Sequence, residues 1–220
     1  MIKSQRLLPL VPLLTALTLS GCQSTYYNAM EKVGIHKRDI MVDRIEATQS
    51  AQEEAKEQFQ SALDRFRNVV SFDGGQLEEL YDSLNSEYED SVAAAENVRA
   101  RIDSVRDVSD ALFDEWESEL DLYRSDKLKR SSQQKLNETR RQYKKMLVKL
   151  EKAEQQMQPV LDAFQDQVLY LKHNLNSQAI AALKGEFGSI KSDIEQLIRD
   201  MQRSIDESRR FVDSLKEQAR

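Results

Sequence analysis

The only cysteine of the 220-residue chain, Cys22, is the residue with the clearest chemical use, and it stands directly behind an apolar run near the start of the sequence. A single thiol cannot form an internal disulfide. A catalytic thiolate needs a neighbouring base and an electropositive setting, which an N-terminal segment rarely supplies. The residues before Cys22 therefore decide which chemistry its sulfur can serve.

Those residues are arranged as a secretion signal. Residues 1–6 carry Lys3 and Arg6 and no acid, and residues 7–19 are almost entirely apolar apart from two prolines. An apolar run of this length is too short to span a bilayer as a stable helix, and a positively charged start is typical of a signal peptide. We therefore expect residues 1–21 to be removed.

The signal closes in Leu19, Ser20, Gly21 and Cys22, which resembles the lipobox of bacterial lipoproteins: an aliphatic residue, two small residues and a cysteine. The resemblance implies that the Cys22 thiol is alkylated by a diacylglycerol and that the new amino terminus is acylated. Two or more acyl chains hold a domain durably on a membrane, whereas one chain binds reversibly. A plain secretory signal with an accidental cysteine, and a buried N-terminal helix, are the alternatives.

Gln23 follows the cysteine where an aspartate, in most Gram-negative lipoproteins, signals retention in the inner membrane. The resemblance therefore implies a lipid-anchored protein of the outer membrane that faces the periplasm. We expect residues 22–38 to form the lipid anchor and tether, and residues 39–220 to form one helical domain.

The composition of the chain after the signal is that of long helices. Removal of residues 1–21 leaves 199 residues and moves the formal net charge from −6 to −8. One proline, Pro159, and five glycines remain, which are too few turn residues for a β fold. Because no second cysteine is present, no disulfide framework can form, and stability must come from apolar contacts.

Apolar residues recur about every 3.5 residues in four stretches, at residues 41–69, 77–123, 143–175 and 180–215. This spacing indicates helices that each bury one continuous stripe. Breaks are expected where turn and capping residues gather, at residues 71–75, 124–132 and 173–177, and a bend is expected at Pro159. The predicted fold is all-α: an elongated antiparallel bundle of about four long helices with coiled-coil-like heptad seams. At the second break Ser131 and Gln134 match a capping box, and Ser125 or Asp126 could cap instead.

The charges are separated along the chain. Eight acids and no base lie between Asp73 and Asn97, five acids lie within residues 114–121, and residues 127–152 hold ten bases against two acids. Folding back near residues 124–132 would set the basic stretch beside the acids of residues 110–121, so we expect these two groups to pair. The basic stretch from Arg130 to Lys152 is otherwise expected to contact anionic lipid headgroups or phosphorylated envelope sugars, and no nucleic acid.

No catalytic or metal-binding pattern is found in the sequence. His36 and His173 lack the Glu-x-x-His spacing of helical metal sites, so both are expected at turns or caps. The segment 185–192 lacks the lysine position of a phosphate loop, and we expect it to be helical, with Gly185 and Gly188 making close packing contacts. The sequence therefore predicts no enzyme, no cofactor and no metal.

Five segments of the chain carry a further resemblance: YYNAMEKVGIHKRDI, VSFDGG, ALFDEWE, RSSQQKLNETR and QVLYLKHNLNSQAI. They are similar to the bacterial family DUF2959, whose members mostly carry lipoprotein signals. The resemblance spans nearly the whole chain after the signal and implies a helical lipoprotein, but it brings no activity, substrate or catalytic residue.

Two functions are compatible with these observations. The first is a non-enzymatic envelope rod, held on the membrane by Cys22, with a structural role or an interaction with another envelope protein or a second copy of itself. The second is a small-ligand or lipid-binding protein with a pocket between helices near Phe113, Trp116 and Tyr123, because aromatic residues gathered at one end of a bundle can line a cavity.

Overall fold

The computed structural model describes residues 22–32, 34–72, 74 and 76–218. The chain divides into two compact units, residues 1–36 and 37–220. In the first unit the structure describes one helix, α1 (Cys22–Lys32), which is followed by Gly34 in a left-handed conformation, with φ of 85°. The predicted signal peptide lies outside the described residues.

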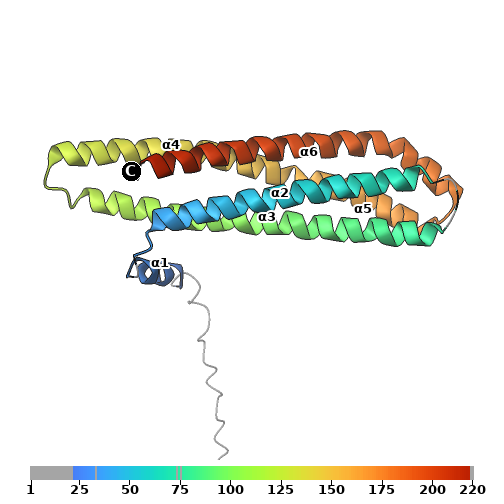
Figure 1. Ribbon diagram of the computed structural model, residues 1–220, viewed down its shortest axis with the longest axis horizontal. Helices are drawn as coiled ribbons and strands as arrows, with labels where there is room; N and C mark the ends of the chain where they lie inside the picture. Colours follow the sequence, from blue (N-terminus) through green and yellow to red (C-terminus); the bar gives the residue numbers. More distant parts are fainter. Residues whose placement is uncertain (1–21, 33, 73, 75, 219–220) are drawn as a thin grey trace, which may run out of the picture. The chain divides into compact units, whose positions relative to one another are not determined.

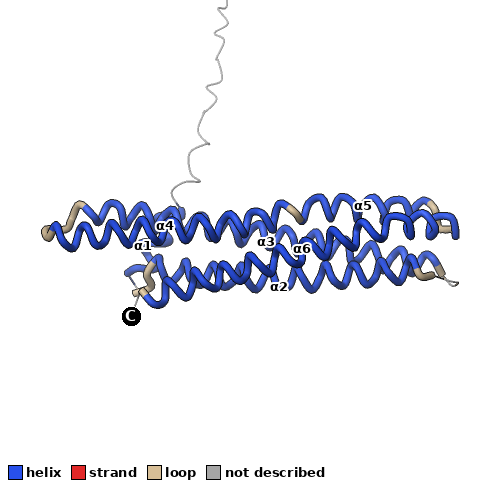
Figure 2. Tube along the Cα trace, turned by 90° about the horizontal axis from the view of Figure 1, so that it is seen from above, coloured by secondary structure: helices blue, strands red, loops and turns tan. Residues whose placement is uncertain are grey.

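The second unit is built from five helices that form four antiparallel rods (Figures 1 and 2). They are α2 (Lys37–Val70), α3 (Leu77–Leu120), α4 (Asp126–Gln155), α5 (Met157–His173) and α6 (Ser177–Glu217). Helices α4 and α5 follow one another as a single rod, interrupted only at Gln156. The rods pack as a ring, α2 against α3 and α6, and the α4–α5 rod against α3 and α6. The predicted antiparallel bundle is thereby confirmed.

The helices end where turn and capping residues stand in the sequence. Gly74 has φ of 149° in the connection between α2 and α3, a conformation that favours glycine. Ser125 caps α4 by accepting a hydrogen bond from the Leu128 amide, so Ser125 is the capping residue, whereas Ser131 lies inside the helix. Asn176 caps α6 by accepting bonds from the Gln178 and Ala179 amides, each at 3.0 Å.

Pro159 marks the change from α4 to α5. The helix is interrupted three residues earlier, at Gln156, and resumes at Met157. Proline lacks an amide hydrogen and its ring crowds the preceding turn, so it is tolerated in the first turn of α5 but not inside an unbroken helix. The predicted bend is therefore a one-residue interruption, after which the rod continues beside α3 and α6.

The core runs along the inside of the four rods and includes a buried polar pair. Large side chains that are essentially inaccessible to solvent come from every rod, among them Ile45, Phe66, Leu84, Leu150, Phe164 and Met201. Between α2 and α6 the buried Gln52 amide donates a hydrogen bond of 3.2 Å to the Ser204 hydroxyl. A buried polar pair of this kind loses its partner if the helices slip, so it fixes the register of α2 against α6.

Candidate functional site: the projecting α3–α4 hairpin

The predicted lipidation site lies at the start of the described chain. Cys22 is the first residue of α1, and its side chain, like that of Gln23, lies outside what the structure describes. Residues Leu19 to Gly21 lie outside the described residues as well. The assignment of Cys22 as a lipid anchor thus stays a prediction from the sequence.

The most distinctive part of the second unit is a hairpin, residues 116–136, in which the end of α3 and the start of α4 run past the other rods (Figure 1). An ion pair of 2.7 Å between Lys37 and Glu115 shows that α2 begins beside Glu115 of α3. A hydrogen bond of 3.4 Å between Thr139 and Gln218 shows that α6 ends beside Thr139 of α4. Helix α4 begins 13 residues before Thr139, so it extends about 20 Å beyond α6.

The projecting hairpin has its own internal contacts. The Trp116 indole donates a hydrogen bond of 2.8 Å to the Ser132 hydroxyl, across the two helices. Leu120 and Leu136 are buried, and Lys129 pairs with Asp121 at 2.9 Å near the turn. These contacts hold the two helices together where no other rod covers them.

The end of the hairpin, which we call the tip, consists of Leu122, Tyr123, Arg124, Lys127 and Leu128. Its three large apolar side chains are exposed: Leu122 to 78%, Leu128 to 57% and Tyr123 to 42%. Leu128 lies 18 residues, or five helical turns, before Met146 and thus on the same face of α4. Met146 is fully buried. The same face is therefore covered inside the bundle and left open at the tip, because α2 and α6 have ended.

The outer face of α4 carries a row of exposed cations. Within the part of the chain that the structure describes, these side chains form no ion pair: Lys127, Arg130, Lys135, Arg141, Lys144 and Lys149. We call this row the basic face. Since like charges repel, such a row is stabilised by anions from outside the helix.

The predicted pairing of this basic stretch with the acids of α3 is only partly correct. Two pairs of the expected kind form, Arg140 with Glu117 and Lys129 with Asp121. In two further contacts between α3 and α4 the signs are reversed, because Arg106 and Arg99 of α3 pair with Glu151 and Glu154 of α4.

Other cations of α4 pair with α6, a neighbour that the sequence pattern did not indicate. Lys152 contacts Asp200 at 3.3 Å, and Lys145 contacts Glu207 at 3.0 Å. Asp200 is only 5% exposed. Burial raises its pKa, but hydrogen bonds from Gln196, Arg203 and Lys152 outweigh burial and lower the pKa of Asp200 to about 2. These pairs connect the rods, whereas the basic face stays exposed.

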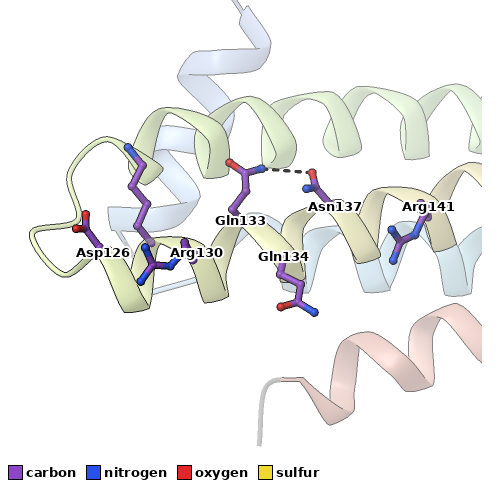
Figure 3. A pocket seen from close by; sticks show the side chains of 7 residues that line it. Asp126, Arg130, Gln133, Gln134, Asn137 and Arg141 are labelled. Atoms are coloured by element: carbon purple, nitrogen blue, oxygen red, sulfur yellow. Dashed lines mark hydrogen bonds between the residues drawn. The ribbon is translucent and has the colours of Figure 1, made fainter.

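A shallow hollow follows α4 within the projecting hairpin and just beyond it (Figure 3). Its lining comes from this one helix: Asp126, Lys129, Arg130, Gln133, Gln134, Asn137 and Arg141. Gln133 donates a hydrogen bond of 3.3 Å to Asn137, and the exposed side chains of Arg130 and Arg141 come from the same helix (Figure 3). Cations and amides of this kind suit an anionic group, and a hollow formed by one helix cannot enclose a ligand.

The three aromatic residues of the predicted pocket do not converge. Phe113 is buried, with its ring 5.4 Å from that of Tyr143. Trp116 is half-buried in the projecting hairpin, and Tyr123 is exposed at the tip. Two of them therefore serve packing, and the third belongs to the exposed tip.

The remaining candidates are structural. His36 is exposed between α1 and α2, and His173 is the exposed last residue of α5. Among the described residues, no three His, Cys, Asp or Glu side chains are grouped so that they could hold a metal ion. The segment 185–192 is helical as predicted, but Gly185 and Gly188 make no close packing contacts: both face open space, with nothing within 4 Å of an added Cβ. The packing prediction for these glycines was wrong.

The exposed tip was not predicted from the sequence. Leu120 and Tyr123 were assigned to the end of one apolar seam, and Leu122 and Leu128 lay outside the predicted seams. The unequal lengths of the helices could have revealed it, because α3 has 44 residues and α2 only 34. A longer rod must extend past a shorter one when the two share a connection at the opposite end.

These features define a class: an all-α bundle of four antiparallel rods with a projecting hairpin. Residues 26–215 match the family of proteins of unknown function DUF2959, and the chain belongs to this family. Among curated proteins, none matches the chain. Over the described residues, no helix is both long enough and apolar enough to cross a membrane.

Proposed function

We propose that this protein is a non-enzymatic component of a bacterial cell envelope, held by lipid on Cys22 at the periplasmic face of the outer membrane. The observation that carries the proposal is the order of three segments along the chain: the lipobox-like sequence, α1 and the bundle. A lipobox-like sequence stands directly before α1, and a bundle with a complete core of its own begins at Lys37, 15 residues after Cys22. An acylated terminus would therefore tether a folded unit without entering its core.

The bundle suits a structural or interaction role better than catalysis. Most of its large apolar side chains pack between the rods, and its exposed features include the basic face and the tip. Such surfaces support binding by charge and by apolar contact, which are the means by which peripheral proteins hold partners and membranes.

The anchor is tested by Cys22→Ser in cells. We expect the variant to leave the membrane fraction and to lose palmitate labelling, because Cys22 offers the only thiol in the chain. Its helical circular dichroism should be unchanged, since Cys22 precedes the bundle. Palmitate label that persists in this variant would overturn the anchor assignment.

The location is tested separately by Gln23→Asp. If the sorting rule of Gram-negative lipoproteins applies, this variant should be retained in the inner membrane, while Gln23→Asn should fractionate like the native protein. Retention of both variants in the outer membrane would contradict the proposed sorting but not the anchor.

The partner is addressed by crosslinking in membranes, followed by light scattering of the purified protein. A stable second copy or a reproducible envelope protein is the expected result. A monomer that crosslinks to no protein would count against the interaction role and leave a purely structural one.

A further inference from the structure

We propose that the tip inserts into the surface of an anionic lipid bilayer, the same bilayer that holds the lipid anchor, so that the bundle is attached at one end by two contacts. This inference rests on the proposed lipid anchor at Cys22. It assigns to the hairpin a partner of defined chemistry: acidic phospholipid headgroups with the adjoining acyl region.

The first argument is the composition of the tip. Leu122, Tyr123 and Leu128 are all exposed at the turn between α3 and α4, which projects past the other rods (Figure 1). A specific protein interface buries roughly 800 Å² on each partner, which five side chains at a turn cannot supply. A bilayer needs no matching shape, and tyrosine is enriched where apolar and polar layers of a membrane meet.

The second argument is charge. Arg124, Lys127 and Arg130 are exposed, lie within two residues of Leu122, Tyr123 or Leu128 in the sequence, and form no ion pair among the described residues. The hairpin holds four acids. Asp121 pairs with Lys129 and Glu117 pairs with Arg140, so only Glu119 and Asp126 are left to offset these three cations. The basic face continues the positive charge along α4, so an anionic surface is attracted to the tip and to the helix behind it.

The third argument is position. The ion pair between Lys37 and Glu115 places the start of the bundle at the same end as the projecting hairpin. With α1 helical, the chain from Cys22 to Lys37 reaches at most about 35 Å. The opposite end of α2 lies about 50 Å from Lys37. A bundle anchored at Cys22 therefore brings its tip to the membrane more readily than its opposite end.

The opposite end provides a matched contrast. It also exposes apolar side chains, Leu169, Tyr170 and Leu175. However, the start of α3, which packs against α5, presents exposed carboxylates of Glu78, Glu79 and Asp82, and these outnumber Lys172, the exposed cation two residues after Tyr170. Acids of this density are repelled by an anionic bilayer. Apolar exposure alone does not distinguish the two ends, and charge does.

The test compares one tryptophan at each end of the complete, acylated protein. In a Trp116→Phe background, which removes the only native tryptophan, Tyr123→Trp and Tyr170→Trp place a single indole at the tip or at the opposite end. Both proteins are reconstituted into vesicles of phosphatidylglycerol and phosphatidylcholine that carry bromine on the acyl chains. We expect at least about a twofold loss of emission for the indole at 123 and almost none at 170, because only an inserted tip meets bromine.

A charge variant sharpens the test. Lys127→Glu with Arg130→Glu should reduce the quenching at 123 severalfold, while Lys172→Glu at the opposite end should leave it unchanged. In vesicles of phosphatidylcholine alone the quenching at 123 should fall as well. Quenching that is equal at 123 and 170 would overturn the proposal, and it would indicate a bundle that lies flat or floats free on its tether.

The outcomes separate this inference from the proposed function. If the acylated protein does not float with vesicles at all, the lipid anchor fails. If it floats and the indole at 123 is not quenched, the anchor stands and the tip contact fails. A tip that crosslinks through Tyr123→Cys to a second protein, without quenching, would assign it to a protein partner and likewise overturn the lipid contact.

A second measurement avoids the Trp116→Phe substitution, which removes the hydrogen bond to Ser132 and could prevent folding. With Trp116 retained, Tyr123→Cys or Tyr170→Cys carries an environment-sensitive dye, because the thiol of Cys22 is consumed by the anchor. A blue shift on vesicle binding at 123 only is the expected result, and equal shifts at both positions contradict the proposal.

Discussion

Both ends of the bundle contain large apolar residues, but the two ends differ in how the rods cover them. At the end that holds the α2–α3 and α5–α6 connections, which we call the closed end, three rods contribute to an aromatic cluster of Phe66, Phe164 and Phe187. At the other end α3 and α4 continue alone, and the apolar face of α4 becomes exposed at Leu128.

This difference shows that an apolar pattern does not by itself mean a core. Inside the bundle the face of α4 that carries Met146 and Leu150 is covered by other rods, and at the tip the same face meets solvent. The closed end therefore supplies stability, and the projecting hairpin supplies a surface. Variants at the two ends should separate these contributions.

The largest effect is expected at the closed end. Phe66 is fully buried, with its ring 6.0 Å from Phe164 and 5.6 Å from Phe187. Phe66→Ala should lower the free energy of unfolding by about 3–5 kcal/mol, because it leaves a cavity among three rods. Tyr123→Ala at the tip is the matched control and should change it by less than about 0.5 kcal/mol. Equal losses in urea denaturation would remove the distinction between the two ends.

A smaller effect is expected between the ends, where Asp200 joins α4 and α6. A pKa of about 2 means that the folded state favours the carboxylate. The resulting stability is present above the unfolded pKa of about 4 and is lost as the pH falls through about 2. Asp200→Asn should cost on the order of 1–2 kcal/mol at pH 6, with exposed partners limiting the value.

Urea midpoints at pH 6 and at pH 2 check this prediction. The difference between Asp200→Asn and the native protein should shrink toward zero at the lower pH. Asp193→Asn, which changes an exposed carboxylate of the same helix, should follow the native protein throughout. A difference that is constant with pH would show that Asp200 acts through packing alone.

The hairpin itself is tested at Ser132, the acceptor of the Trp116 indole. Ser132→Ala should cost about 1 kcal/mol, because the half-buried indole loses its hydrogen bond. The emission of the single tryptophan reports the change directly, and Ser131→Ala, at an exposed neighbour, should leave it unaltered. If emission does not respond to Ser132→Ala, the two helices of the hairpin are not joined by this contact.

The smallest effect is a gain in stability. Gly185 and Gly188 lie in α6 toward the closed end, and an added Cβ at either position meets nothing within 4 Å. Gly185→Ala and Gly188→Ala should each raise the free energy of unfolding by about 0.5–1 kcal/mol, because alanine loses less backbone entropy. A loss of stability in thermal denaturation would mean that these positions are packed after all.

The rods and their ends were predictable because they follow from local rules. The heptad spacing predicted four helical stretches, and the glycines of residues 71–75 and the asparagines of residues 173–177 predicted two of the boundaries. At the third boundary Ser125 was one of several capping candidates, and the structure selects it. Even the interruption near Pro159 follows from the missing amide hydrogen. Local patterns of this kind depend on residues a few positions apart in the sequence and not on which rods lie side by side.

The charge partners and the exposed tip were not predictable in this way, because both depend on which rods lie side by side. The pairs of Lys145 and Lys152 with α6 appear only once the ring of rods is closed. Likewise Tyr123 was predicted to end a buried seam, and its exposure follows only from the lengths of α2 and α6. The lipid anchor, in contrast, is predicted from residues outside the bundle, and the Cys22 variants test it.

The orientation of the bundle on the membrane tests the central claim most directly. Energy transfer is measured from a dye at Tyr123→Cys or at Leu175→Cys to acceptor-labelled lipid headgroups, in the complete, acylated protein on anionic vesicles. We predict nearly complete transfer from the tip and weak transfer from the closed end, because α3 alone is about 65 Å long. Comparable transfer from both ends would contradict an attachment at one end.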